Sequence, residues 1–244
     1  MTAYRCDGTT DGILCCLFRA FSQKEEPYAV FSDCFQPSFD TVVVYVPTDE
    51  KTAERVAAGI IKNCSRPLLE NMVFAARSGD PLKETVIFRA VKKCLEKRAD
   101  ITADLSDYDM LAFHDLIERI RKEIHRFKGF LRFSECEGGG LYAHFEPDND
   151  VSDLLVGHFK KRFSSDKFII HDVKRNVIVV CDGKTHQRIA LSGGITVTLS
   201  QGEKNFNSLW KTYFDSVSIK ERKNTRQQDN YLPRRYRKNM TEFN

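Results

Sequence analysis

A long amphipathic helix is the element of this 244-residue sequence that most constrains its fold. Between residues 113 and 127, apolar side chains recur at intervals of three and four, the spacing of one helix face. They are Phe113, Leu116, Ile117, Ile120, Ile124 and Phe127. Such a stripe has to pack on a core. We expect the helix to end at Gly129. The cationic residues of the same segment fall largely off the stripe: Arg119, Arg121, Lys122, Arg126 and Lys128.

The first half of the chain is expected to be mostly helical around a small sheet. Strands are predicted at Ala3–Arg5 and Thr41–Val46, and the β-branched run of the second suits a buried strand. Predicted helices cover Ile13–Phe21, the segment from the N-cap Thr48 to Asn63, Pro67–Ser78 and Pro81–Arg98. The acidic, polar stretch 100–109 indicates a seam, so we expect a helical region 1–108 and a second region 109–244.

The second half is expected to be an antiparallel sheet packed with helices. Segments 130–135 and 141–146 alternate apolar with polar around three glycines, which predicts a half-buried hairpin. Further strands are predicted at Phe168–Asp172, Val177–Cys181 and Ile195–Leu199, and helices at Val151–Phe163 and Glu203–Val217. The fold class is therefore α+β, with 109–244 as a candidate single compact unit.

Composition places the chain among cytoplasmic globular proteins. The N-terminal segment is polar where a signal peptide needs an apolar core, and no apolar run approaches a membrane span. The eight cysteines are expected to be reduced thiols in such a compartment. With no CxxC pair, the sequence predicts no zinc site, iron–sulfur cluster or other cofactor, although scattered His and Cys leave a metal site open.

Charge is distributed unevenly along the chain. Residues 1–110 hold 14 Lys and Arg against 17 Asp and Glu, whereas residues 111–244 hold 24 against 17. A basic region gains affinity for a polyanion with each phosphate that it neutralises. The second half therefore favours a nucleic-acid partner, and ordinary solvated surface is the alternative.

The tail from Lys220 to Met240 is the most basic segment, with eight Lys and Arg against two acidic residues. Arginine offers a planar fork to phosphate, amides can read base edges, and Tyr231 and Tyr236 can stack on exposed bases. The alternative is that this tail wraps the body, with its arginines paired to the acidic first half.

Four residues of the predicted sheet region are candidates for catalysis: His144, His158, His171 and Asp172. Together with His125, Glu135 and Glu146 they could supply a general base or bind a divalent metal ion. No HExxH, HxH or PD-(D/E)xK spacing fixes their mutual distances, and a lone histidine is more often a hydrogen-bonded core residue.

Several ordered motifs resemble a known family. They include HRFKGF at 125–130, Ile170-His171-Asp172, Leu209-Trp210-Lys211 and Pro233-Arg234-Arg235-Tyr236. The chain resembles the bacterial family named probable DNA metabolism protein, whose core is a domain of unknown function numbered 4130. The resemblance implies a part in DNA repair or modification beside a radical-SAM partner, and it implies no catalytic residue.

Two hypotheses of function follow. In the first, the protein is an accessory that binds DNA through one set of residues: Arg126, Lys128, Arg132, Lys174, Arg175, Arg222, Asn224, Arg226, Arg234 and Arg235. In the second, it is an enzyme acting on nucleic acid, a metal-dependent nuclease or a base-processing enzyme, that uses His, Asp and Glu of residues 125–172. A third reading makes the tail a surface for an acidic or iron–sulfur partner protein.

Overall fold

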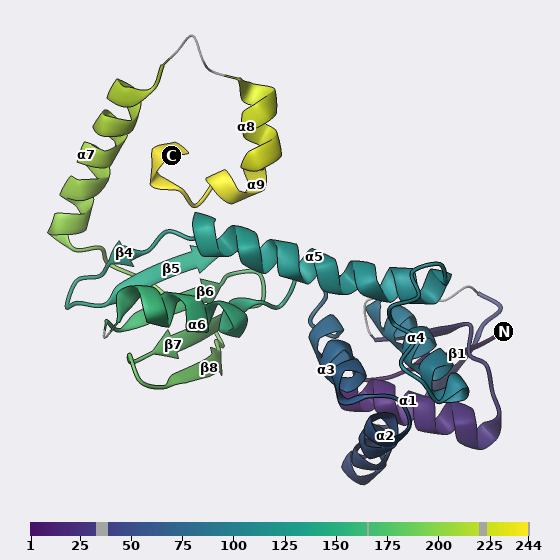
Figure 1. The fold of residues 1–244 in the computed structure, drawn as a ribbon. Coiled ribbons are helices and arrows are strands. Elements are labelled where there is room, and N and C mark those ends of the chain that lie inside the picture. Colours follow the sequence, from purple (N-terminus) through teal and green to yellow (C-terminus); the bar gives the residue numbers. More distant parts are fainter. Residues whose placement is uncertain (33–38, 165, 220–223, 244) are drawn as a thin grey trace. The chain divides into compact units, whose positions relative to one another are not determined.

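The computed structural model describes residues 1–32, 39–164, 166–219 and 224–243 (Figure 1). The chain forms two compact units, one of residues 1–122 with 148–150, the other of residues 123–147 with 151–244. The helix α5 (Tyr108–Phe130) contributes to both. The seam expected at 100–109 runs into the first residues of α5, and its standing as a domain boundary remains a prediction.

The first unit packs helices on a small parallel sheet. Its strands are β1 (Thr2–Arg5), β2 (Ala29–Phe31) and β3 (Val42–Tyr45), in the order β2-β1-β3, and its helices are α1 (Thr10–Gln23), α2 (Glu50–Asn63), α3 (Arg66–Ala75) and α4 (Lys83–Lys97). Apolar side chains from all four helices and from the start of α5 make one core. The apolar stripe that we predicted on α5 is buried here through Phe113, Leu116 and Ile117.

Two local predictions for the first unit are corrected. The β-branched run at 42–45 forms an edge strand, and its Val42 and Tyr45 side chains are each 63% exposed, so the strand is not buried. The N-cap of α2 is Asp49, whose carboxylate accepts from the Thr52 amide, in place of Thr48. Thr48 instead donates to Asp7.

The second unit is built on a five-stranded sheet in the order β4-β5-β6-β7-β8. The strands are β4 (Ser134–Glu135), β5 (Leu141–Phe145), β6 (Phe168–Asp172), β7 (Val177–Cys181) and β8 (His186–Ala190). The helices that follow or connect them are α6 (Ser152–Phe163), α7 (Gln201–Val217), α8 (Thr225–Tyr231), α9 (Arg234–Arg237) and the 3-10 turn η2 (Thr241–Phe243). The α+β class is confirmed.

The sheet is mixed, which corrects the expected antiparallel arrangement. β5 and β6 pair in parallel because α6 carries the chain back across the sheet between them, while the other neighbouring pairs are antiparallel. Gly138, Gly139 and Gly140 make the β4–β5 connection with φ of +87°, +90° and +88°, backbone angles that favour glycine.

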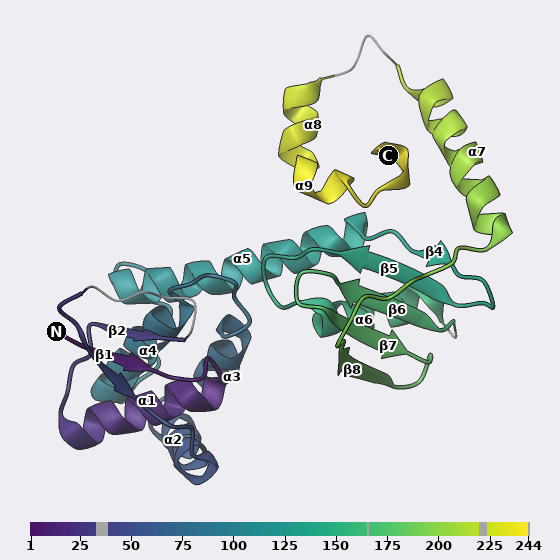
Figure 2. The ribbon, with the colours of Figure 1, turned by 180° about the vertical axis from the view of Figure 1, so that it is seen from behind.

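A strand was expected at Ile195–Leu199, and the structure places the last strand earlier, at β8. In segment 195–199 only Leu199 makes a bridge, to Cys136, supported by the hydrogen bond from the Glu137 amide to the Thr198 carbonyl. Figure 2 shows the segment between β8 and α7 running over the sheet, on the face opposite α6. That segment closes one side of the site described below.

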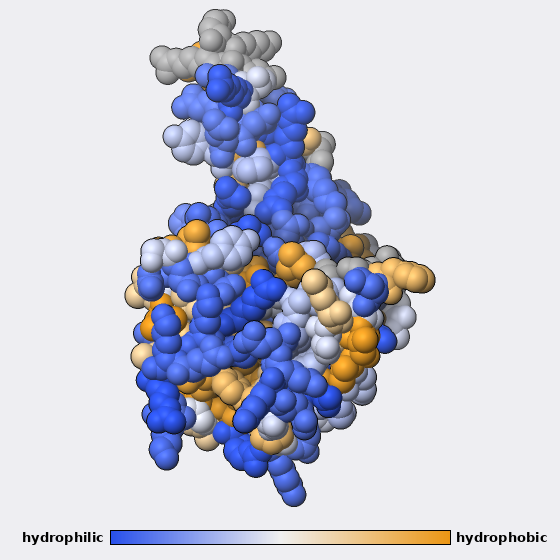
Figure 3. Space-filling view, turned by 90° about the vertical axis from the view of Figure 1, so that its right-hand side faces the viewer, coloured by the Kyte–Doolittle hydropathy of each residue, from blue (hydrophilic) through white to orange (hydrophobic). Residues whose placement is uncertain are grey.

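Hydrophilic side chains dominate the face in Figure 3, and hydrophobic residues occur there in scattered patches. No helix in the described parts of the chain is both long and apolar enough to span a membrane.

Candidate nucleic-acid interface

Strand alternation gives the second unit's sheet two different faces. In β5, Ala143 and Phe145 are buried, whereas Tyr142 and His144 point to the other face. The parallel register sets His144 beside His171 of β6. Two histidines and a tyrosine thus share the face that α6 does not cover.

A short hydrogen bond joins two of these residues. Tyr142 Oη lies 2.6 Å from His171 Nδ1. Burial lowers the pKa of His171, and neighbouring His144 lowers it further, so its imidazole stays neutral near pH 7. Burial also raises the pKa of Tyr142, which keeps its hydroxyl protonated. His171 Nε2 is buried and has no hydrogen-bond partner among the residues that the structure describes.

A pocket of about 410 Å³ opens beside Tyr142 and His144. Three cationic side chains line it, and they come from three separate parts of the chain: Arg132, Lys211 and Lys238. The remaining lining residues are Ser134, Tyr142, His144, Val197, Leu199, Asn207, Asn239 and Thr241. We call this the cationic pocket, because no carboxylate is among these lining residues.

Two of the three cations are held by carboxylates at the edge of the pocket. Arg132 bonds Glu242 at 2.9 Å, and Lys238 bonds Glu146 at 2.5 Å. Burial tends to raise the pKa of Glu242, but hydrogen bonds, of which the one from Arg132 has the largest effect, bring the pKa below its ordinary value. Lys211 has no ion-pair partner among the residues that the structure describes. It is the cation most available to a ligand.

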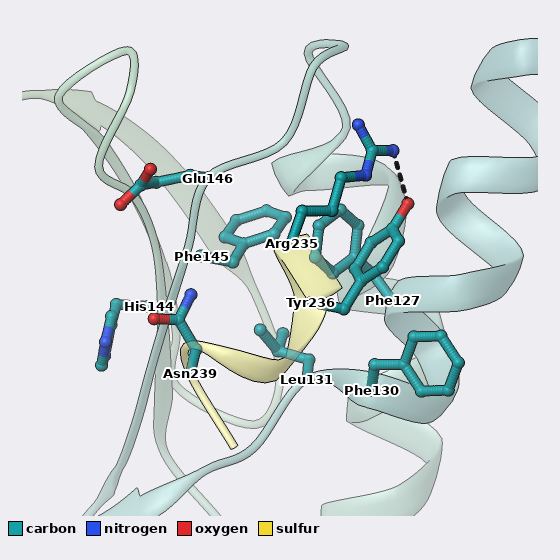
Figure 4. A pocket seen from close by; sticks show the side chains of 9 residues that line it. All are labelled: Phe127, Phe130, Leu131, His144, Phe145, Glu146, Arg235, Tyr236 and Asn239. Carbon is teal, nitrogen blue, oxygen red and sulfur yellow. Dashed lines mark hydrogen bonds between the residues drawn. The ribbon is translucent and has the colours of Figure 1, made fainter. Parts of the chain in front are cut away.

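An aromatic cluster fixes the end of the tail next to this pocket. Tyr236 is 4% exposed, and its ring lies 5.0 Å from that of Phe127 and 5.4 Å from that of Phe130. Figure 4 shows Arg235 reaching the Tyr236 hydroxyl, a hydrogen bond of 2.6 Å. The cavity of about 10 Å³ in this cluster has room for little more than a water molecule. His144 and Asn239 line both this cavity and the cationic pocket.

Comparison with known families places the chain. The model of the domain of unknown function DUF4130 matches residues 81–242, more than half of the sequence. The chain belongs to the DUF4130 family. A search of curated proteins found no match. The DUF4130 match contains every residue of the cationic pocket.

The structure distributes the predicted DNA-binding residues of this DUF4130 protein over several sites. Arg132 lines the cationic pocket, while Arg126 and Arg235 stack on Tyr236 at 5.9 and 4.7 Å from its ring centroid. Burial of that ring means that Tyr236 cannot stack on a base in this structure, whereas Tyr231 is exposed. Lys128 lies on the last turn of α5.

The other predicted binding residues that the structure describes lie outside the pocket. Lys174 and Arg175 occupy the β6–β7 turn, where Arg175 bonds Asp172 at 2.9 Å and the Pro147 carbonyl. Asn224 caps α8 through the Gln227 amide, Arg226 is exposed on α8, and Arg234 pairs with Asp229. Arg222 lies outside the described residues.

The catalytic candidates do not form one group. His144 lines the cationic pocket and His171 lies beside it on the same sheet face. Asp172 points to the opposite face of the sheet, where it is fully buried and forms an ion pair with Arg175. His158 sits on α6, where burial and the charge of Lys128 lower its pKa. Within the described ranges, no group of three or more His, Cys, Asp or Glu could hold a metal ion.

Sequence reasoning missed most of the pocket. Lys211, Lys238, Asn207 and Asn239 were not among the candidates, because each is an unremarkable polar residue in its own segment. They come together where α7 packs on β4 and η2 and where Lys238 of the tail pairs with Glu146. The available signal was weak: Lys211 follows the single tryptophan, and Lys238 closes a basic run.

Proposed function

We propose that the second unit of this DUF4130 protein binds nucleic acid, with a backbone phosphate in the cationic pocket. The observation that carries the proposal is the pocket itself: three converging cations, two side-chain amides and no carboxylate in the lining. DNA is the expected polymer, in line with the DNA metabolism that the family resemblance implies.

The pocket suits such a ligand in size and chemistry. Its volume of about 410 Å³ lies within the range of ~300–1,000 Å³ typical of small-molecule sites. Lys211 and Lys238 offer point charges to a phosphate, and Arg132 can offer a bidentate fork once it is released from Glu242 and the Gly129 carbonyl. Asn207, Asn239 and the Tyr142 and His144 rings add polar and aromatic contacts of the kind that nucleotides use.

Fluorescence anisotropy with labelled oligonucleotides tests the proposal on the full chain. We expect binding at low salt that Lys211→Glu weakens by tenfold or more, because the substitution turns an attractive charge into a repulsive one. Lys161→Glu is the matched control, since Lys161 is an exposed lysine of α6, on the other side of the sheet. No binding at low salt, or equal loss in both variants, would disprove the proposal.

A second candidate, an enzyme acting on nucleic acid, is favoured by His144. This histidine lines the pocket beside the Tyr142–His171 hydrogen bond and could transfer a proton to or from a bound nucleotide. His144→Asn should then abolish cleavage or base release while oligonucleotide binding persists. Absence of turnover with single-stranded, duplex and base-damaged substrates between pH 5 and 9 would discard this candidate.

The radical-SAM partner remains a proposal that rests on the family resemblance alone. Co-expression and affinity purification with a radical-SAM protein encoded beside this one should recover a complex. Failure to recover it under anaerobic conditions, with the iron–sulfur cluster intact, would count against the partnership without touching the binding proposal.

A further inference from the structure

Helix α7 leaves an apolar face uncovered. None of its residues is buried, and four large side chains on one face are more than half exposed: Phe206 (58%), Leu209 (68%), Tyr213 (57%) and Val217 (53%). They follow the i, i+3, i+4 spacing of a helix stripe that normally packs on something. Exposed apolar patches of this kind mark interaction sites.

Aromatic rings make up most of this face. The Phe206 and Trp210 rings lie nearly parallel, at 15°, with centroids 6.4 Å apart. Trp210 and Tyr213 follow at 5.8 Å and 35°. We call Phe206, Trp210 and Tyr213 the aromatic run. It extends over about two turns of α7 and presents ring surface to solvent.

The aromatic run adjoins the cationic pocket on the same helix. Asn207 and Lys211, which line the pocket, alternate along α7 with Phe206 and Trp210. Glu242, the carboxylate that holds Arg132, lies in η2, which packs against α7. A ligand that reaches the phosphate-binding cations therefore meets the aromatic rings next.

We infer that the ligand is a single-stranded nucleic acid whose bases stack on the aromatic run while its backbone enters the cationic pocket. This inference rests on the proposed function and specifies its substrate class. Proteins that bind single strands combine a cationic groove with aromatic side chains on which successive bases stack. In a duplex the base faces are covered by their neighbours, so a duplex could use the cations but not the rings.

The cations of the pocket beside the apolar face of α7 favour a nucleic acid over a protein partner or a second copy of this chain. A protein partner with an apolar surface could cover Leu209 and Val217. Such a partner would not explain why three cations converge beside the aromatic run. A polyanion with flat apolar bases accounts for both features. A second copy of this chain would place like charges together, because it carries the same cations.

Trp210 makes the test direct, because it is the only tryptophan of the chain. Binding of an unlabelled oligothymidylate to the full chain should quench tryptophan fluorescence, and an equal length of duplex should quench it much less. Phe206→Ala and Tyr213→Ala should each weaken single-strand binding at least about fivefold, the lower bound of one stacking contact. Both side chains are exposed, so the fold should survive, as circular dichroism can verify.

Val217→Ala is the matched control, since it shortens an exposed aliphatic side chain of the same face outside the aromatic run and should change binding less than twofold. If single strand and duplex bind alike, without quenching and without loss in Phe206→Ala, the inference is wrong while the proposed function stands. If no nucleic acid binds at all, both fall. A dimer in light scattering that Phe206→Ala dissolves would assign the face to a second copy and overturn the inference.

Discussion

Replacing Lys211 by glutamine should change the salt dependence of nucleic-acid binding by a defined amount. Each phosphate neutralised on a single strand contributes about −0.7 to the slope of log K against log salt. With Lys211 alone engaged the slope is about −0.7, and with Arg132 and Lys238 released from Glu242 and Glu146 it reaches about −2.1. Between 50 and 200 mM salt these limits correspond to losses of about 2.6-fold and about 18-fold.

Lys211→Gln should make the slope shallower by about 0.7 in either limit, because Lys211 has no ion-pair partner among the described residues and contributes in both. The assay is anisotropy of a labelled single strand at five or more salt concentrations, with the full chain. Lys161→Gln should leave the slope unchanged. An unchanged slope in Lys211→Gln, or an equal change in the control, would refute the assignment of a phosphate to this lysine.

Three further predictions concern stability, each measured by urea unfolding. Tyr236→Ala should lower the free energy of unfolding by about 3–5 kcal/mol, because it empties a buried site against Phe127. Tyr236→Phe should lower it by only about 1 kcal/mol, for the lost hydroxyl contact. Equal losses in the two variants would contradict this. Gly139→Ala should cost about 1 kcal/mol or more because of its φ of +90°, and no cost would mean that the turn relaxes. Because the folded pKa of His171 lies below its ordinary 6.5, the unfolded chain binds more protons, so stability should fall as the pH drops below about 6.5. His171→Asn should flatten that decline in part, since His158 shifts in the same direction, and an unchanged profile would rule His171 out.

Much of the fold could be predicted because the apolar pattern of a single segment was enough to determine its secondary structure. The strands predicted at Phe168–Asp172 and Val177–Cys181, on either side of the polar segment Lys174-Arg175-Asn176, have the predicted bounds. Five of the six stripe residues on α5 are buried as the helical period required, and Ile124 is partly exposed. In each case the side chains of one segment carry enough apolar surface to fix that segment's conformation and orientation.

The failures all depend on neighbours that the local sequence does not contain. Residues 42–45 have the composition of a buried strand, yet they occupy an edge of the sheet, since β1 takes the central position. β8 has the polar sequence HQRIA and is exposed throughout, so its pairing with β7 has no hydrophobic signature. The parallel β5–β6 pair follows from the α6 crossover.

The site was the least predictable part, for the same reason. Of the proposed arginines that the structure describes, only Arg132 lines the cationic pocket. Basic composition identified the right half of the chain, but it could not distinguish an arginine that supports a fold, as Arg175 does with Asp172, from a cation left for a ligand. That distinction depends on which carboxylates lie within reach, and this is set by tertiary contacts.

The basic tail acquires a different role from the one that its composition suggested. Tyr236 anchors it in an aromatic cluster on α5, and its cations pair with carboxylates of the same unit: Arg235 with Glu123, Lys238 with Glu146, and Arg234 and Arg237 with Asp229. A docked tail places Lys238, Asn239 and Thr241 in the pocket wall and Glu242 against Arg132. Much of its positive charge is thus used to build the pocket. The affinity for phosphate then depends on the few cations that no carboxylate compensates. Among the cations of the pocket, Lys211 of α7 is the clearest case.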